Sequence, residues 1–219
     1  MSDRRCLRWL TQSLAVPQVL ATEFTGAAFR QCLAGQGDYL IGHLNDFRQE
    51  FDRDCSEQAC LHLLMAKNFL LTGRVRAVQS AERLRRDLTR GMAFTGPAQL
   101  LSHAIANYPD TLDGLHHRLL DELEIIEDHV LDERHRGERK RLMLVRREMA
   151  QLHRHMRSLR RVLVNAERTL ASFPEGLKPV VPRLTHLDQD FEVMEARARF
   201  FHDEIDAKLA SETNRQLYV

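Results

Sequence analysis

Two stretches of the sequence decide the fold: 142-LMLVRREMAQLHRHMRSLRRVLVNAERTL-170 and 184-LTHLDQDFEVMEARARFFHDEI-205. Apolar residues recur in both at alternating intervals of three and four positions, which is a seven-residue repeat. Such a repeat keeps one apolar seam facing a partner helix, so it predicts long helices with coiled-coil-like packing. The seam positions are Leu142, Val145, Met149, Leu152, Met156, Leu159, Leu163, Ala166 and Leu170, then Leu184, Leu187, Phe191, Met194, Ala198, Phe201 and Ile205.

A connection separates these two helices, because residues 172–182 contain three prolines and a glycine. A final helix from about Pro182 to Val219 would be roughly 57 Å long at 1.5 Å per residue. That length exceeds the ~13 Å radius of gyration of a typical 100-residue domain. We therefore expect this helix to project, to oligomerise or to continue into another part of a longer protein.

The charges before the connection are divided between two segments. Asp110 to Glu133 holds nine carboxylates and one arginine, whereas Arg134 to Arg161 holds eleven basic residues and two glutamates. A short turn at residues 135–137 between them predicts an antiparallel helical hairpin, in which the charges set orientation while the apolar seam provides most of the stability. The alternative is that Arg139 to Arg161 binds RNA. The acidic neighbour and the lack of interleaved aromatics disfavour it, so no nucleic-acid partner is expected.

The first third of the chain has a different pattern, which predicts a helix near Asp3 to Leu14 followed by short apolar pieces. Gly35-Gln36-Gly37-Asp38 between two of these pieces predicts a hairpin turn. A basic amphipathic helix is expected from Arg74 to Gly91. The predicted strands of a small mixed sheet are Phe29 to Leu33, Tyr39 to Leu44, Ala59 to Ala66 and Asn68 to Leu71.

A further helix is predicted from Pro97 to Glu133, with a kink at Pro109. The fold class that follows is α+β, an α/β part with a mixed sheet and helices, followed by long antiparallel helices. We expect three parts: a small α/β part over residues 1–91, a charged helical hairpin over 92–172 and a long stalk helix over 173–219.

Composition narrows the function. The 219 residues carry a formal net charge of +1, which argues against a generic nucleic-acid binder. Four cysteines without a CxxC pair are typical of reduced thiols in a cytosolic protein. No stretch approaches the roughly 18 uninterrupted apolar residues of a membrane-spanning helix. Nucleotide-binding, zinc-protease, hydrolase and EF-hand motifs are all absent, so we expect no catalytic residues and no enzyme.

Eleven histidines raise the question of metal binding. His186 with Asp190, and His202 with Asp206, have the four-residue spacing that places two ligands on one helix face. The carboxylates of residues 121–128 are dense enough to attract a hard cation. A solvated helix face is the simpler interpretation of each pair, so these four residues are weak metal candidates.

The last helix has a second stripe, distinct from its apolar seam. Asp203, Ala207, Ala210, Asn214 and Leu217 recur at intervals of four and three residues, and the stripe ends in an apolar turn without a helix-stop signal. An ordinary wet helix face is one interpretation. The other is that the helix leads into a further segment.

At this point the sequence resembles a known family, the CorA/ZntB divalent-cation transporters, in their cytoplasmic funnel domain. The resemblance is most specific at Leu119 to Leu131, at Leu159 to Leu163 and at Glu212 to Val219, and it extends in architecture from Phe29. It implies that Val219 is followed by the first of two transmembrane helices and by a Gly-Met-Asn motif, which this sequence lacks. If the natural reading frame stopped at Val219, the transporter interpretation would be wrong.

The resemblance also assigns site residues. Asn214 matches the pore-facing asparagine at the cytoplasmic mouth, Leu217 takes the place of the hydrophobic gate, and Asp203 matches an acidic ring in the funnel. Like groups repeated around a symmetry axis attract cations and gate by dewetting. The implied assembly is a pentameric homo-oligomer on the cytoplasmic side of the inner membrane, held there by the transmembrane helices.

The implied function is the cytoplasmic part of a transporter of Mg²⁺, Co²⁺, Ni²⁺ or Zn²⁺. It would form the funnel-shaped ion path, with sensing of cations as a further hypothesis. No cofactor is expected other than a transported or sensed divalent cation, Mg²⁺ or Zn²⁺. The alternative from another class is a soluble coiled-coil protein-interaction module with no transport role, and an enzyme with an unrecognised site ranks third.

Overall fold

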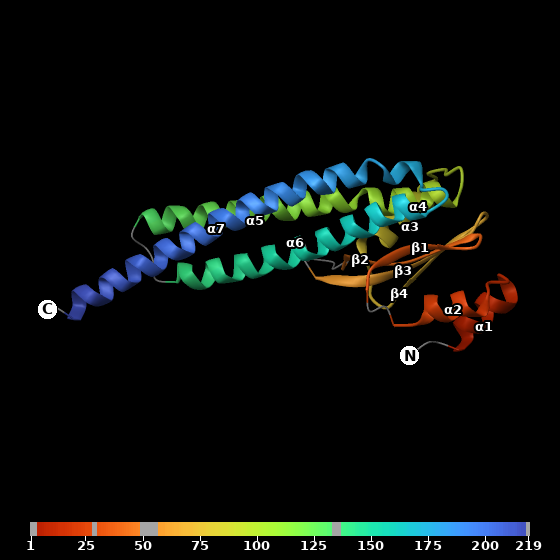
Figure 1. Ribbon diagram of the computed structural model, residues 1–219, viewed down its shortest axis with the longest axis horizontal. Coiled ribbons are helices and arrows are strands. Elements are labelled where there is room, and N and C mark those ends of the chain that lie inside the picture. The colour runs from red at the N-terminus through yellow and green to blue at the C-terminus, as the bar shows by residue number, and fades with distance from the viewer. Residues whose placement is uncertain (1–3, 28–29, 49–56, 133–136, 218–219) are drawn as a thin grey trace. The chain divides into compact units, whose positions relative to one another are not determined.

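The computed structural model describes residues 4–27, 30–48, 57–132 and 137–217 (Figure 1). They fall into two compact units, here called the sheet unit (residues 1–109 and 158–183) and the helical unit (110–157 and 184–219). The elements are α1 (Arg4–Ser13), α2 (Gln18–Thr25), β1 (Cys32–Gln36), β2 (Tyr39–Phe47), β3 (Gln58–Met65), β4 (Leu70–Arg74), α3 (Gln79–Thr89), α4 (Pro97–Ala106), α5 (Tyr108–Leu131), α6 (Glu138–Thr169), the short 3₁₀ turn η1 (Glu175–Leu177) and α7 (Val180–Leu217).

The sheet has four strands in the order β1-β2-β3-β4, and every neighbouring pair is antiparallel. The α+β fold class is thereby confirmed, but the sheet is an antiparallel meander rather than a mixed sheet. The expected hairpin is present, with Gln36 paired to Tyr39 across the turn. Gly37 adopts a φ of +60° there, which a residue without a Cβ tolerates best. Strands that follow one another in the chain are therefore neighbours in the sheet, and antiparallel neighbours need no crossover connection.

One face of the sheet packs against the first two helices. Ile41 of β2 and Leu64 of β3, which are cross-strand partners, join a buried apolar cluster with Leu10, Leu20 and Phe24. The eight-residue helix α2 was missed by the sequence analysis. Its start follows Pro17, whose fixed φ suits a helix N-terminus. Because α2 has only eight residues, the spacing of its apolar residues is too short a pattern to predict a helix.

Helix α3 begins later than the sequence predicted. It starts at Gln79 rather than near Arg74, and Val75 lies outside it with 94% of its surface exposed. The cap comes from the sheet, because Asp46 Oδ2 accepts hydrogen bonds from the backbone N–H of Ser80 at 2.9 Å and from its hydroxyl at 2.5 Å. Burial raises the pKa of Asp46, and these hydrogen bonds oppose that rise.

The segment expected as one kinked helix is two helices. Helix α4 ends at Ala106 and α5 begins at Tyr108, so the break lies at Asn107, two residues before Pro109. A proline disfavours helical geometry in the residue before it but is tolerated in the first turn. The chain therefore starts a new helix around Pro109. Tyr108 anchors this start, because its ring stacks on Phe47 and its hydroxyl accepts a hydrogen bond from Gln58 at 3.2 Å.

The seven-residue repeat is confirmed by burial. Of the predicted seam positions, only Leu170, just past the end of α6, and Phe201 on α7 are half-buried, and all the others are buried. In the helical unit, α5 and α6 run antiparallel, as the ion pairs Arg118–Glu148 and Arg141–Glu122 show. The divided charges of the hairpin therefore do face each other. Helix α7 begins at Val180, two residues before the expected Pro182.

Within the ranges that the structure describes, no helix has an apolar stretch of the length and hydropathy that a bilayer span requires.

Candidate functional site

The residues expected to line an ion path lie on one unbroken helix, α7. Asp203 and Asn214 are both exposed, and they stand about three turns apart on one face of the helix. Leu217 is the last helical residue that the structure describes, and its side chain lies outside the described part. Asp203 and Asn214 are therefore both presented to solvent along a single helix.

The opposite side of α7 provides the packing. Leu187, Phe191, Met194, Ala198 and Ile205 are buried in the helical unit. An apolar seam of this extent holds the helix without using the stripe. The stripe thus remains available for contacts with ions or with other copies of the chain.

The weak metal candidates on α7 are not brought together into a ligand set. His186 and Asp190 are exposed, and in the described residues neither belongs to a group of three converging ligands. His202 Nε2 lies 3.6 Å from Asp206 Oδ2, but Arg139 Nε lies 3.2 Å from Asp206 Oδ1. A guanidinium on the same carboxylate opposes a cation there.

The acidic face of α5 is also engaged by arginines. Glu122 pairs with Arg141, whose Nη2 lies 2.7 Å from Glu122 Oε1. Arg197 of α7 pairs with Glu127, and its Nη1 lies 3.7 Å from Glu124. Internal neutralisation of this kind leaves less negative potential for a divalent cation.

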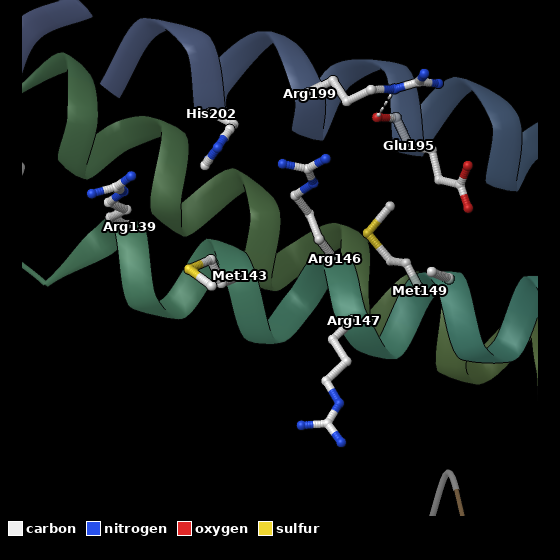
Figure 2. Close-up of a pocket in the computed structure, with 9 residues that line it drawn as sticks. Arg139, Met143, Arg146, Arg147, Met149, Glu195, Arg199 and His202 are labelled. Carbon is white, nitrogen blue, oxygen red and sulfur yellow. Dashed lines mark hydrogen bonds between the residues drawn. The ribbon is translucent and has the colours of Figure 1, made fainter. Parts of the chain in front are cut away.

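A groove of about 610 Å³ lies between α6 and α7 in the helical unit (Figure 2). Figure 2 shows Arg146 directed toward α7 and Arg147 directed away from it. Arg139 and Arg199 add to the positive lining, His202 also lines the groove, and Glu195 is its single carboxylate. A surface of this charge suits anions better than cations, so the groove is not a candidate cation site.

A buried polar cluster joins α6 to α7. His153, with 5% of its surface exposed, has Nε2 2.7 Å from Asp188 Oδ1 and Nδ1 3.0 Å from Glu195 Oε1. Its ring stacks on Phe191, and Arg157 Nε lies 3.6 Å from Asp188. Each ring nitrogen thus has a carboxylate oxygen within hydrogen-bonding distance. The geometry is that of a buried hydrogen-bond network that fixes the register of two helices.

Sequence reasoning missed the groups that the structure does bring together. In the part of the chain that the structure describes, three sets of side chains place potential ligand atoms within 4.8 Å of one another: His43, Cys60 and His62; Asp113, His116 and His117; and His153, Asp188 and Glu192. Only the second is confined to neighbouring positions on one helix. The others join residues distant in sequence, and no local spacing marks them. The histidine count was the single signal that could have prompted the search.

Comparison with known proteins gives one family. Residues 2–219 match the family described as "CorA-like Mg2+ transporter protein". Over 223 aligned residues the chain is 22% identical to the "Zinc transport protein ZntB" of Pectobacterium atrosepticum. That alignment covers 97% of this chain but 66% of the relative, so the chain spans less than two thirds of that protein's length.

Solved structures share the fold. A structure of the full-length CmaX protein superposes with a TM-score of 0.85 at 18% identity, covering 98% of this chain and 68% of that one. The cytoplasmic domain of ZntB from Vibrio parahaemolyticus gives a TM-score of 0.67 at 15% identity, covering 94% and 84% of the two chains. At these identities the likeness establishes the architecture of α1 to α7.

Proposed function

The chain belongs to the family of CorA-like Mg²⁺ transporter proteins, and on that premise we propose that it is the cytoplasmic part of a divalent-cation transporter in the inner membrane. The observation that supports this most is the family match over residues 2–219, together with a zinc-transport relative aligned along 97% of the chain. A cytoplasmic domain of another zinc transporter has the same fold.

Helix α7 is the element to which we assign the ion path. Asp203 and Asn214 are exposed on one face of this helix, and Leu217 follows one turn after Asn214. In a closed homo-oligomer, a pentamer in our proposal, each would form a ring of like groups around the axis. Asp and Asn oxygens suit a hydrated divalent cation, and a leucine ring suits a hydrophobic gate.

The second candidate function, a coiled-coil interaction module with no transport role, is less favoured. The buried seams of α6 and α7 account for the seven-residue repeat within one chain, so the repeat does not call for a separate partner. The family match also favours transport over this alternative.

Cross-linking in the full-length protein tests the ion path. Asn214→Cys, in a background with Cys6, Cys32, Cys55 and Cys60 changed to serine, should form disulfides between subunits on mild oxidation. Thr213→Cys is the matched control, because it is exposed on the same turn but about 100° around the helix. Equal cross-linking of the two variants, or none in an assembled oligomer, would contradict the assignment.

Cation sensing by the helical unit is the finer part of the proposal. Carboxylates on α5 and α7 would bind a divalent cation and thereby stabilise the assembled state. The arginines that pair with Glu122, Glu124 and Glu127 compete with such binding. Thermal unfolding in millimolar Mg²⁺ and in EDTA decides whether the carboxylates bind a cation or are neutralised by the arginines. A higher unfolding midpoint in Mg²⁺ supports sensing, and identical midpoints contradict it.

A further inference from the structure

The middle of the sheet carries two histidines and a cysteine on adjacent strands. His43 of β2 lies directly opposite His62 of β3, and their ring centroids are 4.6 Å apart at an interplanar angle of 86°. Cys60 precedes His62 by two residues in the same strand, so the two side chains point to the same face. A ring nitrogen of each histidine and the Cys60 sulfur all lie within 4.8 Å of one another.

The two histidines are buried without hydrogen-bond partners for one nitrogen each. His43 is 6% exposed and His62 is 9% exposed. The Nδ1 atoms of both rings have no partner among the described residues. Buried polar atoms in folded proteins nearly always find one, so two such atoms in a single cluster call for a ligand.

The surroundings hold these rings in place. The Phe24 ring packs edge-on against His62, with centroids 6.1 Å apart, and the Phe24 backbone is a hydrogen-bonding partner of the His62 ring. Gly73, opposite His62 on β4, makes room for Phe24, because a Cβ there would lie 3.0 Å from Phe24 Cζ. A backbone partner of this kind is what orients a ligating histidine in metal sites.

The donor set determines which metals fit. A metal binds the unprotonated ring nitrogen of a histidine, and burial lowers the pKa of both His43 and His62. Burial also raises the pKa of the Cys60 thiol, so a metal must displace its proton on binding. Two imidazoles and a thiolate are ligands for Zn²⁺ and similar transition metals, whereas Mg²⁺ requires oxygen.

We propose that His43, Cys60 and His62 form a zinc-binding site on the sheet. Tetrahedral Zn–N and Zn–S bonds of about 2.0–2.3 Å hold neighbouring ligand atoms about 3.3–3.7 Å apart, so donor atoms that lie within 4.8 Å of one another need to approach by at most about 1.5 Å. Cys60 is half-buried, which gives an ion access from solvent. Cys32, the cross-strand neighbour of His43, does not belong to this converging group among the described residues, so the fourth position is left to water.

This site is independent of the ion path assigned above. It lies on β2 and β3 of the sheet unit, whereas the stripe of Asp203 and Asn214 lies on α7 in the helical unit. Failure of zinc binding at the sheet would leave the cross-linking result for Asn214→Cys unchanged. Failure of the Asn214→Cys cross-linking would likewise leave zinc binding at the sheet unchanged.

Co²⁺ substitution under reducing conditions tests the site in the 219-residue chain. A bound Co²⁺ with a thiolate ligand gives a sulfur-to-metal charge-transfer band. Cys60→Ser should abolish this band and weaken Zn²⁺ affinity, measured by competition with a chromophoric chelator, by about tenfold or more. Cys6→Ser on α1 is the matched control, a half-buried thiol outside the cluster, and should retain both. A band that survives in Cys60→Ser, or that is absent from the unaltered chain, would overturn the proposal.

Thiol alkylation followed by mass spectrometry gives a second measurement that needs no variant. Zn²⁺ should slow the modification of Cys60 in the unaltered chain and leave that of Cys6 unchanged. Mg²⁺ should slow neither. Equal alkylation rates of Cys60 with and without Zn²⁺ would contradict the site.

Discussion

Buried histidines in the two units of the chain have different surroundings. In the helical unit, His153 has both ring nitrogens within 3.0 Å of a carboxylate oxygen, from Asp188 and Glu195. In the sheet unit, His43 and His62 are as deeply buried, but one nitrogen of each has no partner among the described residues. A satisfied buried network stabilises a unique packing, whereas unsatisfied polar atoms reduce stability until a ligand binds them.

The comparison indicates a division of roles. The helical unit combines an apolar seam with paired charges, which suits a rigid support for the exposed stripe of α7. The sheet unit combines an apolar cluster beneath α1 and α2 with a group of potential metal ligands. The buried contacts of His153 therefore fix helix register in the helical unit, whereas the unpartnered nitrogens of His43 and His62 are the basis of the site that we propose in the sheet unit.

The largest effect should come from the seam of the helical unit. Leu152 of α6 is fully buried, so Leu152→Ala removes apolar contacts and leaves a cavity. We expect the free energy of unfolding to fall by about 2–5 kcal/mol, as measured by urea denaturation followed by circular dichroism.

Leu144→Ala on the same helix is the control. Leu144 is 58% exposed, and its truncation should change the free energy of unfolding by no more than about 0.5 kcal/mol. A loss below about 1 kcal/mol for Leu152→Ala would mean that the seam does not stabilise the helical unit.

A smaller effect should separate the two kinds of buried histidine. In EDTA, His153→Leu removes the imidazole partner of the Asp188 and Glu195 carboxylates and leaves both without it, so it should cost about 1–3 kcal/mol of unfolding free energy. His43→Leu removes a nitrogen that has no partner, so it should cost less than about 1.5 kcal/mol or stabilise the chain.

The comparison of the two kinds of buried histidine is tested by which substitution, His153→Leu or His43→Leu, costs more unfolding free energy. If His43→Leu were the more costly substitution in EDTA, the sheet histidines would have partners that contribute to stability. Both measurements should be repeated in Zn²⁺. The His153→Leu variant keeps the sheet site and should gain stability from the metal, whereas the His43→Leu variant should not.

The helices were predictable from the sequence to a degree that the sheet was not. The seven-residue repeat is local, and its positions from Leu142 to Ala166 are buried as predicted. Strand pairing is not local, so nothing in the sequence could place His43 opposite His62 or bring Cys60 beside them. The start of α3 was misplaced for the same reason, since its cap is Asp46 from β2.

The stripe of α7 shows a third case. Its spacing predicted a shared face for Asp203 and Asn214, and the structure describes both as exposed. Their role in an ion path came from the family resemblance alone. A single helix of one chain has no symmetry axis, so the role of these residues stays a prediction.

The smallest effect should come from the charges that face each other across the hairpin. Arg118 of α5 pairs with Glu148 of α6, and both side chains are partly exposed. A double-mutant cycle with Arg118→Ala and Glu148→Ala should give a coupling free energy of about 0.2–1 kcal/mol, because solvent screens the pair and both side chains lose rotamer freedom. The coupling should decrease in high salt.

A double-mutant cycle for Arg197 and Glu127 should give a larger coupling free energy, because the Glu127 side chain is only 11% exposed. Equal coupling in the two cycles would mean that burial does not strengthen ion pairs in the helical unit. The divided charges of α5 and α6 would then contribute to its stability as much as the polar contacts made by α7.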